Sequence, residues 1–331
     1  MTETKREIPV LYLVVPCYNE EEVVEKTAAV MREKLSRLER ENKIAKASKI
    51  MFVNDGSKDA TLRLLHGIAA GDKKFSVVSL SGNYGHQSAI LAGMMTARKY
   101  ADAVVTIDAD LQQDIEALDL FLQSYMDGCE VVYGVRNDRH SDGIFKKVTA
   151  TAYYRLMHML GSTVMTNHAD YRLMSKKALD ALSEYRETNL FLRGLIPTMG
   201  FPSDVVYFDV KAREAGHSKY TLSKMFTLAM DGITSMSVRP LRLIGGLGFL
   251  MFLFSMVMCV ISLVDWVMGN NVPGYTTTLI VSLIIGGITL LSLGIIGEYV
   301  GKIYMETKHR PRYIIDTLVW REEEEKAGEE Q

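Results

Sequence analysis

The stretch that decides the fold runs from Val10 to Glu21 and reads VLYLVVPCYNEE. Its first six residues form a continuous apolar run that stops at Pro16, which is typical of a β-strand buried on both faces. A charged segment over 20–41 follows, with apolar residues at nearly helical spacing. A buried strand followed at once by a helix predicts the first unit of an α/β sheet.

The same alternation repeats along the chain. Short apolar runs predict further strands at 49–53, 75–80, 103–107 and 130–133. Helical patterns lie between them, at 59–70, 85–100 and 114–126. We therefore expect a mostly parallel, Rossmann-like α/β sheet flanked by helices, with ligands bound beyond the carboxyl ends of its strands.

Acidic residues follow two of these strands. Asp55 comes after the second strand, and Asp108 and Asp110 come after the fourth. Residues i and i+2 of an extended chain point to the same side, so Asp108 and Asp110 are predicted to reach one hard cation, with Gln112 adding a neutral oxygen. Alone this pattern is weak, because acids are common at strand ends. The chain contains neither GxGxxG nor GxxxxGK[ST], which disfavours the usual dinucleotide fold and a P-loop NTPase.

Composition excludes several classes of protein. The 331 residues include 38 Lys or Arg and 40 Asp or Glu, giving a net charge of −2, too close to neutral for a general nucleic-acid binder. The three cysteines, Cys17, Cys129 and Cys259, form no CxxC pair, so neither a disulfide framework nor a structural zinc site is expected.

Two uncharged runs, at about 243–264 and 276–298, are long enough to cross a bilayer. Lys and Arg flank the pair on its outer sides and are missing from the segment between the runs, so both ends of the hairpin are predicted to face the cytoplasm. The alternative is a pair of buried helices in a soluble domain, where apolar runs of this length are rare.

These features predict three regions. Residues 1–238 form a cytosolic α/β domain, 239–304 a membrane hairpin and 305–331 a cytosolic acidic tail. Amphipathic segments at about 144–160 and 220–236 either lie in the membrane interface or pack against the sheet.

Several motifs occur together and in a recognisable order. Val14–Glu21, Val53–Asp59 and Asp108–Gln112 are joined by 83–93, by Asp170-Tyr-Arg-Leu-Met174, and by 213–220 before the hairpin. The chain thereby resembles the family 2 glycosyltransferases of GT-A fold, and among them the polyprenyl-phosphate glycosyltransferases of the dolichyl-phosphate mannose synthase type. The bacterial bactoprenyl-phosphate glucosyltransferases are the most similar branch. The resemblance covers about residues 8–315, and it departs from the commoner D-F-R at Tyr171.

This resemblance implies an inverting hexosyltransferase that moves one sugar from a UDP-sugar to undecaprenyl phosphate on the cytoplasmic face of the cell membrane. Glucose is the first candidate and N-acetylglucosamine the second. The product implies a functional link to a flippase and to a second glycosyltransferase, and a homo-oligomer is possible. Nucleic acid is not an expected partner.

The resemblance also assigns site residues. Mg²⁺ or Mn²⁺ on the donor diphosphate would be held by Asp110, Gln112 and Asp108. The nucleotide pocket would contain Pro16, Tyr18 and Glu20, with Asp55 holding uracil or ribose and Gly56 and Ser57 shaping the turn. Alternatively, Pro16 only ends a strand and Asn54-Asp-Gly56 is a plain turn.

Asp170 is placed beside the reacting sugar, as a base or as an orienting group. The second pKa of a phosphate monoester is near 6, so the acceptor is already largely a dianion and a strong base is not required. The alternative is a buried acid paired with Arg172. Candidates to bind the acceptor phosphate, or else solvated surface groups, are Arg136, Lys146, Arg213, Ser218 and Lys219.

Two other functions remain open. A processive polysaccharide synthase would carry Q-x-x-R-W and usually more membrane spans, and neither tryptophan of this chain has that context. A catalytically inactive, nucleotide-binding membrane scaffold would not need the acids, which are intact here.

Overall fold

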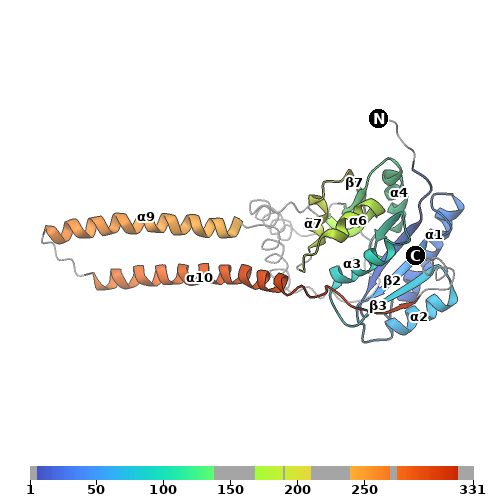
Figure 1. The fold of residues 1–331 in the computed structure, drawn as a ribbon, viewed down its shortest axis with the longest axis horizontal. Coiled ribbons are helices and arrows are strands. Elements are labelled where there is room, and N and C mark those ends of the chain that lie inside the picture. The colour runs from blue at the N-terminus through green and yellow to red at the C-terminus, as the bar shows by residue number, and fades with distance from the viewer. Residues whose placement is uncertain (1–5, 138–167, 189–190, 210–238, 269–273, 320–331) are drawn as a thin grey trace. The chain divides into compact units, whose positions relative to one another are not determined.

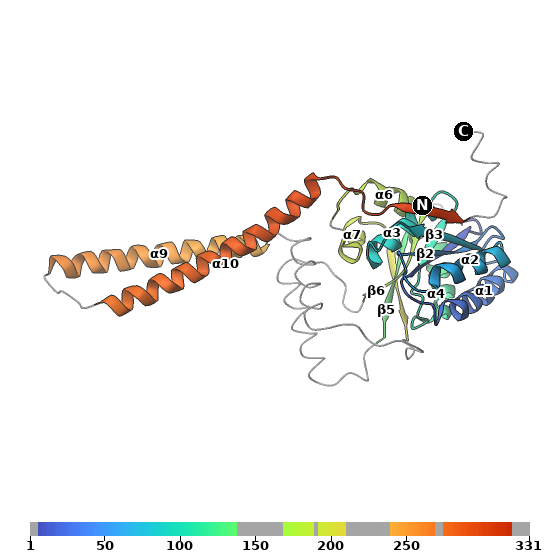
Figure 2. The same cartoon turned by 90° about the horizontal axis from the view of Figure 1, so that it is seen from below.

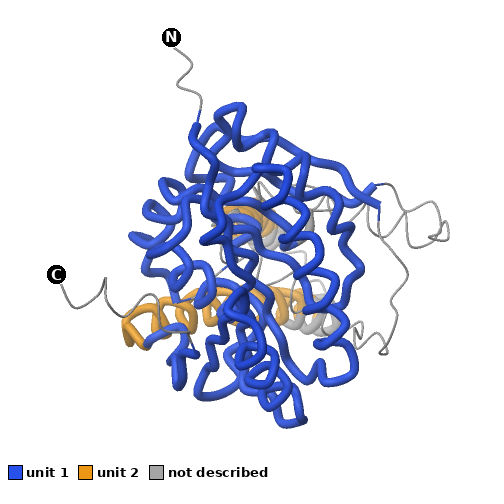
Figure 3. Tube along the Cα trace, turned by 90° about the vertical axis from the view of Figure 1, so that its right-hand side faces the viewer, with its two compact units in different colours: residues 1–154, 163–220, 311–331 blue, residues 155–162, 221–310 orange. Residues whose placement is uncertain are grey.

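The computed structural model describes residues 6–137, 168–188, 191–209, 239–268 and 274–319 (Figure 1). These residues fall into two compact units, coloured separately in Figure 3. The first unit contains the described residues up to 209 together with 311–319, and the second contains 239–268 and 274–310. The two amphipathic segments at 144–160 and 220–236 lie outside the described residues.

The first unit is built on an eight-stranded sheet in the order β7-β5-β6-β4-β1-β2-β3-β8. Its strands are β1 (Leu11–Cys17), β2 (Lys49–Asn54), β3 (Phe75–Leu80), β4 (Ala103–Thr106), β5 (Val131–Arg136), β6 (His168–Ser175), β7 (Ser203–Phe208) and β8 (Ile315–Val319). Its helices are α1 (Val24–Arg40), α2 (Thr61–Gly71), α3 (His86–Ala97), α4 (Leu118–Met126, after a 3-10 turn at Ile115–Ala117), α6 (Lys176–Glu184) and α7 (Leu192–Thr198). The mostly parallel α/β fold is thus confirmed.

Two strands run antiparallel to their neighbours. β6 lies between β4 and β5, antiparallel to both, and β8 pairs antiparallel with β3. The sequence patterns predicted neither strand. β6 carries an acid and an arginine on one face, so it lacks an apolar run, and β8 falls within the segment 305–331 that we expected to form a separate tail.

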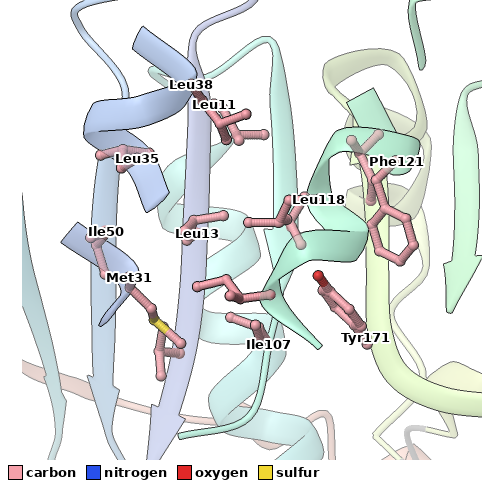
Figure 4. Packing of buried hydrophobic residues seen from close by; sticks show 14 of the residues in the cluster. Leu11, Leu13, Met31, Leu35, Leu38, Ile50, Ile107, Leu118, Phe121 and Tyr171 are labelled. Atoms are coloured by element: carbon pink, nitrogen blue, oxygen red, sulfur yellow. The ribbon is translucent and has the colours of Figure 1, made fainter. Parts of the chain in front are cut away.

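Helices cover both faces of the sheet. On one face, α1 and α4 pack Leu35 and Phe121, among others, into a core with Leu11 and Leu13 of β1 (Figure 4). Full burial of each such side chain contributes about 1.5–3 kcal/mol. On the other face α3 lies so close to the strands that a Cβ added at Gly93 would come within 2.7 Å of the side chain of Val53. The sheet is therefore held rigidly, and its strand ends are fixed in space.

The second unit is a pair of long apolar helices, α9 (Arg239–Val267) and α10 (Tyr275–Thr307), which lie side by side and antiparallel in Figures 1 and 2. Both extend beyond the predicted runs. Their most apolar windows, Leu241–Met258 and Ile284–Thr307, have mean hydropathies of 2.0 and 1.7. None of the side chains that the structure describes in these windows is buried within the protein. Apolar surface of this extent requires a non-aqueous environment, and both helices are long enough to cross a bilayer.

Candidate active site

Asp170 meets the end of β4 because β6 runs antiparallel to it. The register pairs Thr106 at the end of β4 with Arg172, and the Thr106 hydroxyl donates to the carbonyl of Asp170. Residues near the start of β6 therefore lie beside the loop that follows β4. This topology brings Asp170 to Asp108, which lies 62 residues earlier in the sequence.

The loops after β1 and β2 are hydrogen-bonded to each other. The backbone N–H of Asn19 donates to the Ser57 hydroxyl at 3.1 Å, and that of Glu20 donates to the Thr61 hydroxyl at 2.8 Å. Asn19 has a φ of 54°, a left-handed conformation that asparagine tolerates well. The turn leaves Tyr18 38% exposed. Ser57 thus holds the loop that carries Tyr18.

Asp55 binds the next loop. Its carboxylate is buried and accepts hydrogen bonds from the backbone N–H groups of Tyr84 at 2.7 Å and Gly85 at 2.9 Å. Burial raises the pKa of Asp55, although these two hydrogen bonds oppose the rise. Gly56 has a φ of +64°, and its backbone lies directly against that of Gly82. The geometry shows that Asp55 and Gly56 together position the 82–85 loop.

The acids after β4 do not lie on an extended chain, so the geometric premise used for them was wrong. β4 ends at Thr106, and the chain then turns, with Leu111 at a φ of 54°. Asp108 and Asp110 are nevertheless neighbours. Burial raises the pKa of Asp108, and the nearby carboxylates of Asp170 and Asp110 add to the rise.

The two glutamines after these acids have different roles. The side chain of Gln113 donates to Asp108 Oδ2 at 2.6 Å and accepts from the Asp108 backbone N–H at 3.0 Å. Gln112, the predicted ligand, bonds Asp110 through its backbone N–H at 3.1 Å. Gln113 therefore fixes Asp108, and the Gln112 backbone orients Asp110.

Three nitrogen-bearing side chains surround the buried carboxylate of Asp170. Arg172 Nη2 lies 2.7 Å from Oδ1, and Arg193 donates through Nε to Oδ1 at 3.1 Å and through Nη2 to Oδ2 at 2.8 Å. His86 Nε2 lies 3.4 Å from Asp170 Oδ2 and 3.5 Å from Asp108 Oδ1. The pairing of Asp170 with Arg172 is confirmed, and the imidazole bridges the two acids.

These partners determine the charge of Asp170. Burial opposes ionisation, but His86, Arg193 and Arg172 outweigh it and hold the pKa of Asp170 well below its usual range. Asp170 is thus a stable anion and a weak base. Burial lowers the pKa of His86, but Asp170 and Asp108 outweigh this effect, so the pKa is raised overall.

The oxygen donors at this point suit a divalent cation. The charge of Asp108 is disfavoured by its burial and by two neighbouring carboxylates, and a hard cation would relieve that repulsion. Among the described residues there is no cluster of three or more His, Cys, Asp or Glu that would form a complete metal site. A cation here would take further ligands from elsewhere, as Mg²⁺ commonly does from substrate phosphates.

Of the predicted acceptor-phosphate residues, the structure describes only Arg136. It is the last residue of β5, and its guanidinium acts to lower the pKa of Asp108. Arg136 therefore belongs to the same charged cluster. Lys146, Arg213, Ser218 and Lys219 lie outside the described residues.

Sequence reasoning missed His86, Gln113 and Arg193 as members of the cluster. His86 lies inside the motif at 83–93, but the motif alone assigns it no role. Arg193 belongs to none of the quoted motifs, and only the packing of α7 against β6 brings it to Asp170.

Comparison with known proteins identifies the family. Residues 12–183, more than half of the chain, match the model described as glycosyl transferase family 2. The chain belongs to glycosyl transferase family 2. Residues 239–303 of this glycosyltransferase match a second model, the GtrB C-terminal hairpin, which spans α9 and α10. The glycosyltransferase therefore associates with a membrane through its hairpin.

Its relatives extend over nearly the whole chain. It is 46% identical to the uncharacterized glycosyltransferase YkoT of Bacillus subtilis, over 96% of this chain and 95% of that protein. It is 37% identical to the bactoprenol glucosyl transferase of Shigella phage SfV, over 92% of this chain and 97% of that protein. Among solved structures, glucosyl-3-phosphoglycerate synthase from Mycobacterium tuberculosis has a TM-score of 0.47 at 18% identity, covering 70% of this chain and 78% of that one. The resemblance stated from the motifs is confirmed.

Proposed function

We propose that this glycosyltransferase moves a single hexose from a UDP-sugar to a polyprenyl phosphate, undecaprenyl phosphate in bacteria. Glucose is the favoured sugar and N-acetylglucosamine the second choice. The observation that carries the proposal is the combination of a family 2 domain with the hairpin, at 37% identity to a bactoprenol glucosyl transferase across both parts. A lipid acceptor also accounts for the hairpin, which would keep the enzyme at the surface where the acceptor phosphate lies.

The proposed orientation places the catalytic domain and both ends of the chain in the cytoplasm. Arg239 and Arg242 precede the first apolar run, and Lys302, Lys308, Arg310 and Arg312 follow the second. The connection between the helices contains no Lys or Arg. This asymmetry supports cytoplasmic ends. A lipid-linked sugar made there would need a flippase and a second glycosyltransferase to be used outside.

The proposed reaction is a direct displacement with inversion at the anomeric carbon. A phosphate oxygen of the acceptor forms the new bond to that carbon, and the bond to the UDP oxygen breaks, so that UDP leaves with the electron pair. The acceptor is mostly a dianion at neutral pH, so no proton has to be removed from it. The chemistry requires stabilisation of charge on UDP and correct placement of the sugar.

The donor would occupy the strand ends described above. Tyr18 offers an exposed ring to the base, and Pro16 and Glu20 flank it in the β1 loop. Asp55, Gly56 and Ser57 would shape the pocket through the loops that they fix. In this proposal Asp55 supports the pocket wall and does not need to contact uracil directly. Asp108, Asp110 and Gln112 would hold Mg²⁺ or Mn²⁺, which would neutralise charge developing on the leaving UDP.

Asp170 acts in this proposal as an orienting and electrostatic group. Its carboxylate is held as an anion by two guanidinium groups, which argues against a role as general base. Placed near the anomeric carbon, an anion stabilises the positive charge that develops there in the transition state. Arg136, which faces the same cluster, would attract a phosphate group.

A transfer assay tests the proposal. Purified enzyme in detergent receives Mn²⁺, undecaprenyl phosphate and one of a panel of radiolabelled UDP-sugars, and label is counted in the organic phase. We expect label from UDP-glucose above all, and its loss in Asp110→Ala and Asp170→Ala. Asp180→Ala is the matched control, because this acid forms an exposed ion pair with Arg98 on the protein surface.

Two results would remove the proposal. Absence of lipid label from every donor, with UDP binding intact, would favour a nucleotide-binding scaffold or another acceptor. Label that stays in a polymer rather than in the lipid phase would favour a processive synthase.

A further inference from the structure

One side chain donates hydrogen bonds to both oxygens of the Asp170 carboxylate. Arg193 donates through Nε to Oδ1 at 3.1 Å and through Nη2 to Oδ2 at 2.8 Å. Arg172 reaches Oδ1, and His86 lies nearest to Oδ2. Of these three partners Arg193 alone spans both oxygens, and a planar fork of this kind fixes the plane of a carboxylate as well as its position.

The backbone next to Arg193 is fixed from two sides. The N–H of Leu192 donates to the side chain of Gln87 at 3.0 Å, and the carbonyl of Leu192 accepts from Arg172 Nη1 at 3.4 Å. Gln87 follows His86 in α3, and Arg172 belongs to β6 with Asp170. The start of α7 is therefore tied to the two elements that carry the other partners of Asp170, and the fork is preset before any substrate binds.

The contact of Arg193 with Asp170 does more than balance the charge of a buried acid. Arg172, fully buried beside Asp170, already supplies one positive charge for one negative charge. Arg193 adds a second positive charge, which also lowers the pKa of Asp170, but its side chain is 35% exposed rather than enclosed. A partly exposed arginine that holds both oxygens of a buried carboxylate is placed to set its orientation toward a ligand.

We propose that Arg193 is a positioning residue of the sugar transfer, acting through Asp170. This inference rests on the proposed function. Arg193 holds the Asp170 carboxylate in the plane that faces the anomeric carbon, and so contributes to turnover rather than to donor or acceptor affinity. Its loss leaves Asp170 with Arg172 at one oxygen and His86 near the other, but without the fork that fixes the plane of the carboxylate.

Kinetics of Arg193→Ala and Arg193→Lys test this role. Hydrogen bonds to a charged group are worth a factor of about 10 to 150, so we expect kcat to fall by about that factor in Arg193→Ala. Arg193→Lys keeps the charge but loses the fork, so its kcat should fall by at least about tenfold. The KM values for UDP-sugar and for polyprenyl phosphate should each stay within about twofold, and Tm within a few degrees.

Two controls separate positioning from folding. Because Arg193 is partly exposed, added guanidinium ion should restore part of the turnover of Arg193→Ala, which a structural defect would not show. Arg98→Ala is the matched control, since Arg98 makes a comparable partly exposed ion pair with Asp180, and its kcat should equal that of the parent enzyme.

Three outcomes would overturn the inference. Unchanged kcat in both variants would show that the fork has no role in turnover. A raised KM for either substrate at constant kcat would make Arg193 a binding residue for that phosphate-bearing substrate. A large fall in Tm without rescue would make it structural. Failure of the proposed function can be told apart from failure of this inference, because the parent enzyme itself would then form no glycolipid. In that case the same variants would be compared by their hydrolysis of UDP-sugar.

Discussion

Replacing Gly56 with alanine tests how the candidate donor pocket is built. Gly56 has a φ of +64°, and a Cβ at this position would lie 2.7 Å from the backbone nitrogen of Asn83 and closer still to the carbonyl carbon of Gly82. The obstacle is backbone, so it cannot rotate away as a side chain would. The 82–85 loop, which Asp55 holds through Tyr84 and Gly85, would have to move.

The size of the effect follows from two contributions. A left-handed conformation costs an L-residue about 1–2 kcal/mol, and restoring ordinary carbon contacts of about 3.5 Å requires the loop to retreat by roughly 1 Å. Together we expect a loss of about 2–4 kcal/mol in the free energy of unfolding. A misplacement of about 1 Å near a site costs as much as 100-fold in rate, so turnover should fall by about 10- to 100-fold.

Calorimetric UDP binding, transfer kinetics and thermal unfolding would measure these effects. Gly67→Ala is the first control, because Gly67 lies within α2 with nothing within 4 Å of its added Cβ and should become slightly more stable. Gly85→Ala is the second, because Gly85 has a φ of +89° in open space and reports strain without overlap. Gly56→Ala with UDP affinity and turnover equal to those of Gly67→Ala would refute the argument that this loop contact shapes the pocket.

Three further predictions follow from other parts of the structure. Thr317→Pro should interrupt β8, speed amide exchange in β3 and lower Tm by a few degrees, whereas Thr317→Val should not. Hydrogen bonds from buried Lys34 lower the pKa of Glu116 from its ordinary 4.5, and those from Lys34 and Lys43 outweigh burial and lower the pKa of Asp119 from its ordinary 3.8. The stabilisation from these ion pairs should therefore be complete above the ordinary pKa values and be lost as the pH falls below them. Unfolding midpoints between pH 3 and 6 should show this loss, with a flatter profile in Lys34→Met; equal slopes would contradict it. Chelation by EDTA should abolish transfer, and added Mn²⁺ or Mg²⁺ should restore it; full activity after chelation would exclude the metal.

Much of the fold could be predicted because buried parallel strands appear in the sequence as continuous apolar runs. Strands such as β1 and β2 are apolar on both faces and end in polar residues, so their positions and their functional edge were predicted together. β6 escaped prediction because Asp170 and Arg172 occupy one of its faces and only Tyr171 and Leu173 on the other face enter the core. β8 escaped because its partner β3 lies more than 200 residues earlier in the chain.

The candidate site was predictable where residues lie within motifs and not where packing alone assembles them. Asp108, Asp110 and Asp170 were found from their motifs, but the fork of Arg193 depends on how α7 meets β6. Extended-chain geometry failed for Asp110, since this residue lies in a turn that continues into Leu111 with its φ of 54°. Asp55 also accepts hydrogen bonds from the backbone of the 82–85 loop, a contact that the sequence patterns do not indicate because it depends on how two loops meet.

The most direct test of the central claim is mass spectrometry of the lipid formed by the parent enzyme in vesicles that contain undecaprenyl phosphate, after addition of UDP-glucose and Mn²⁺. The account predicts a single new species that carries one hexose on the lipid phosphate, with UDP released in equal amount. A lipid or polymer that carries several sugars, or release of UDP without any glycolipid, would contradict it.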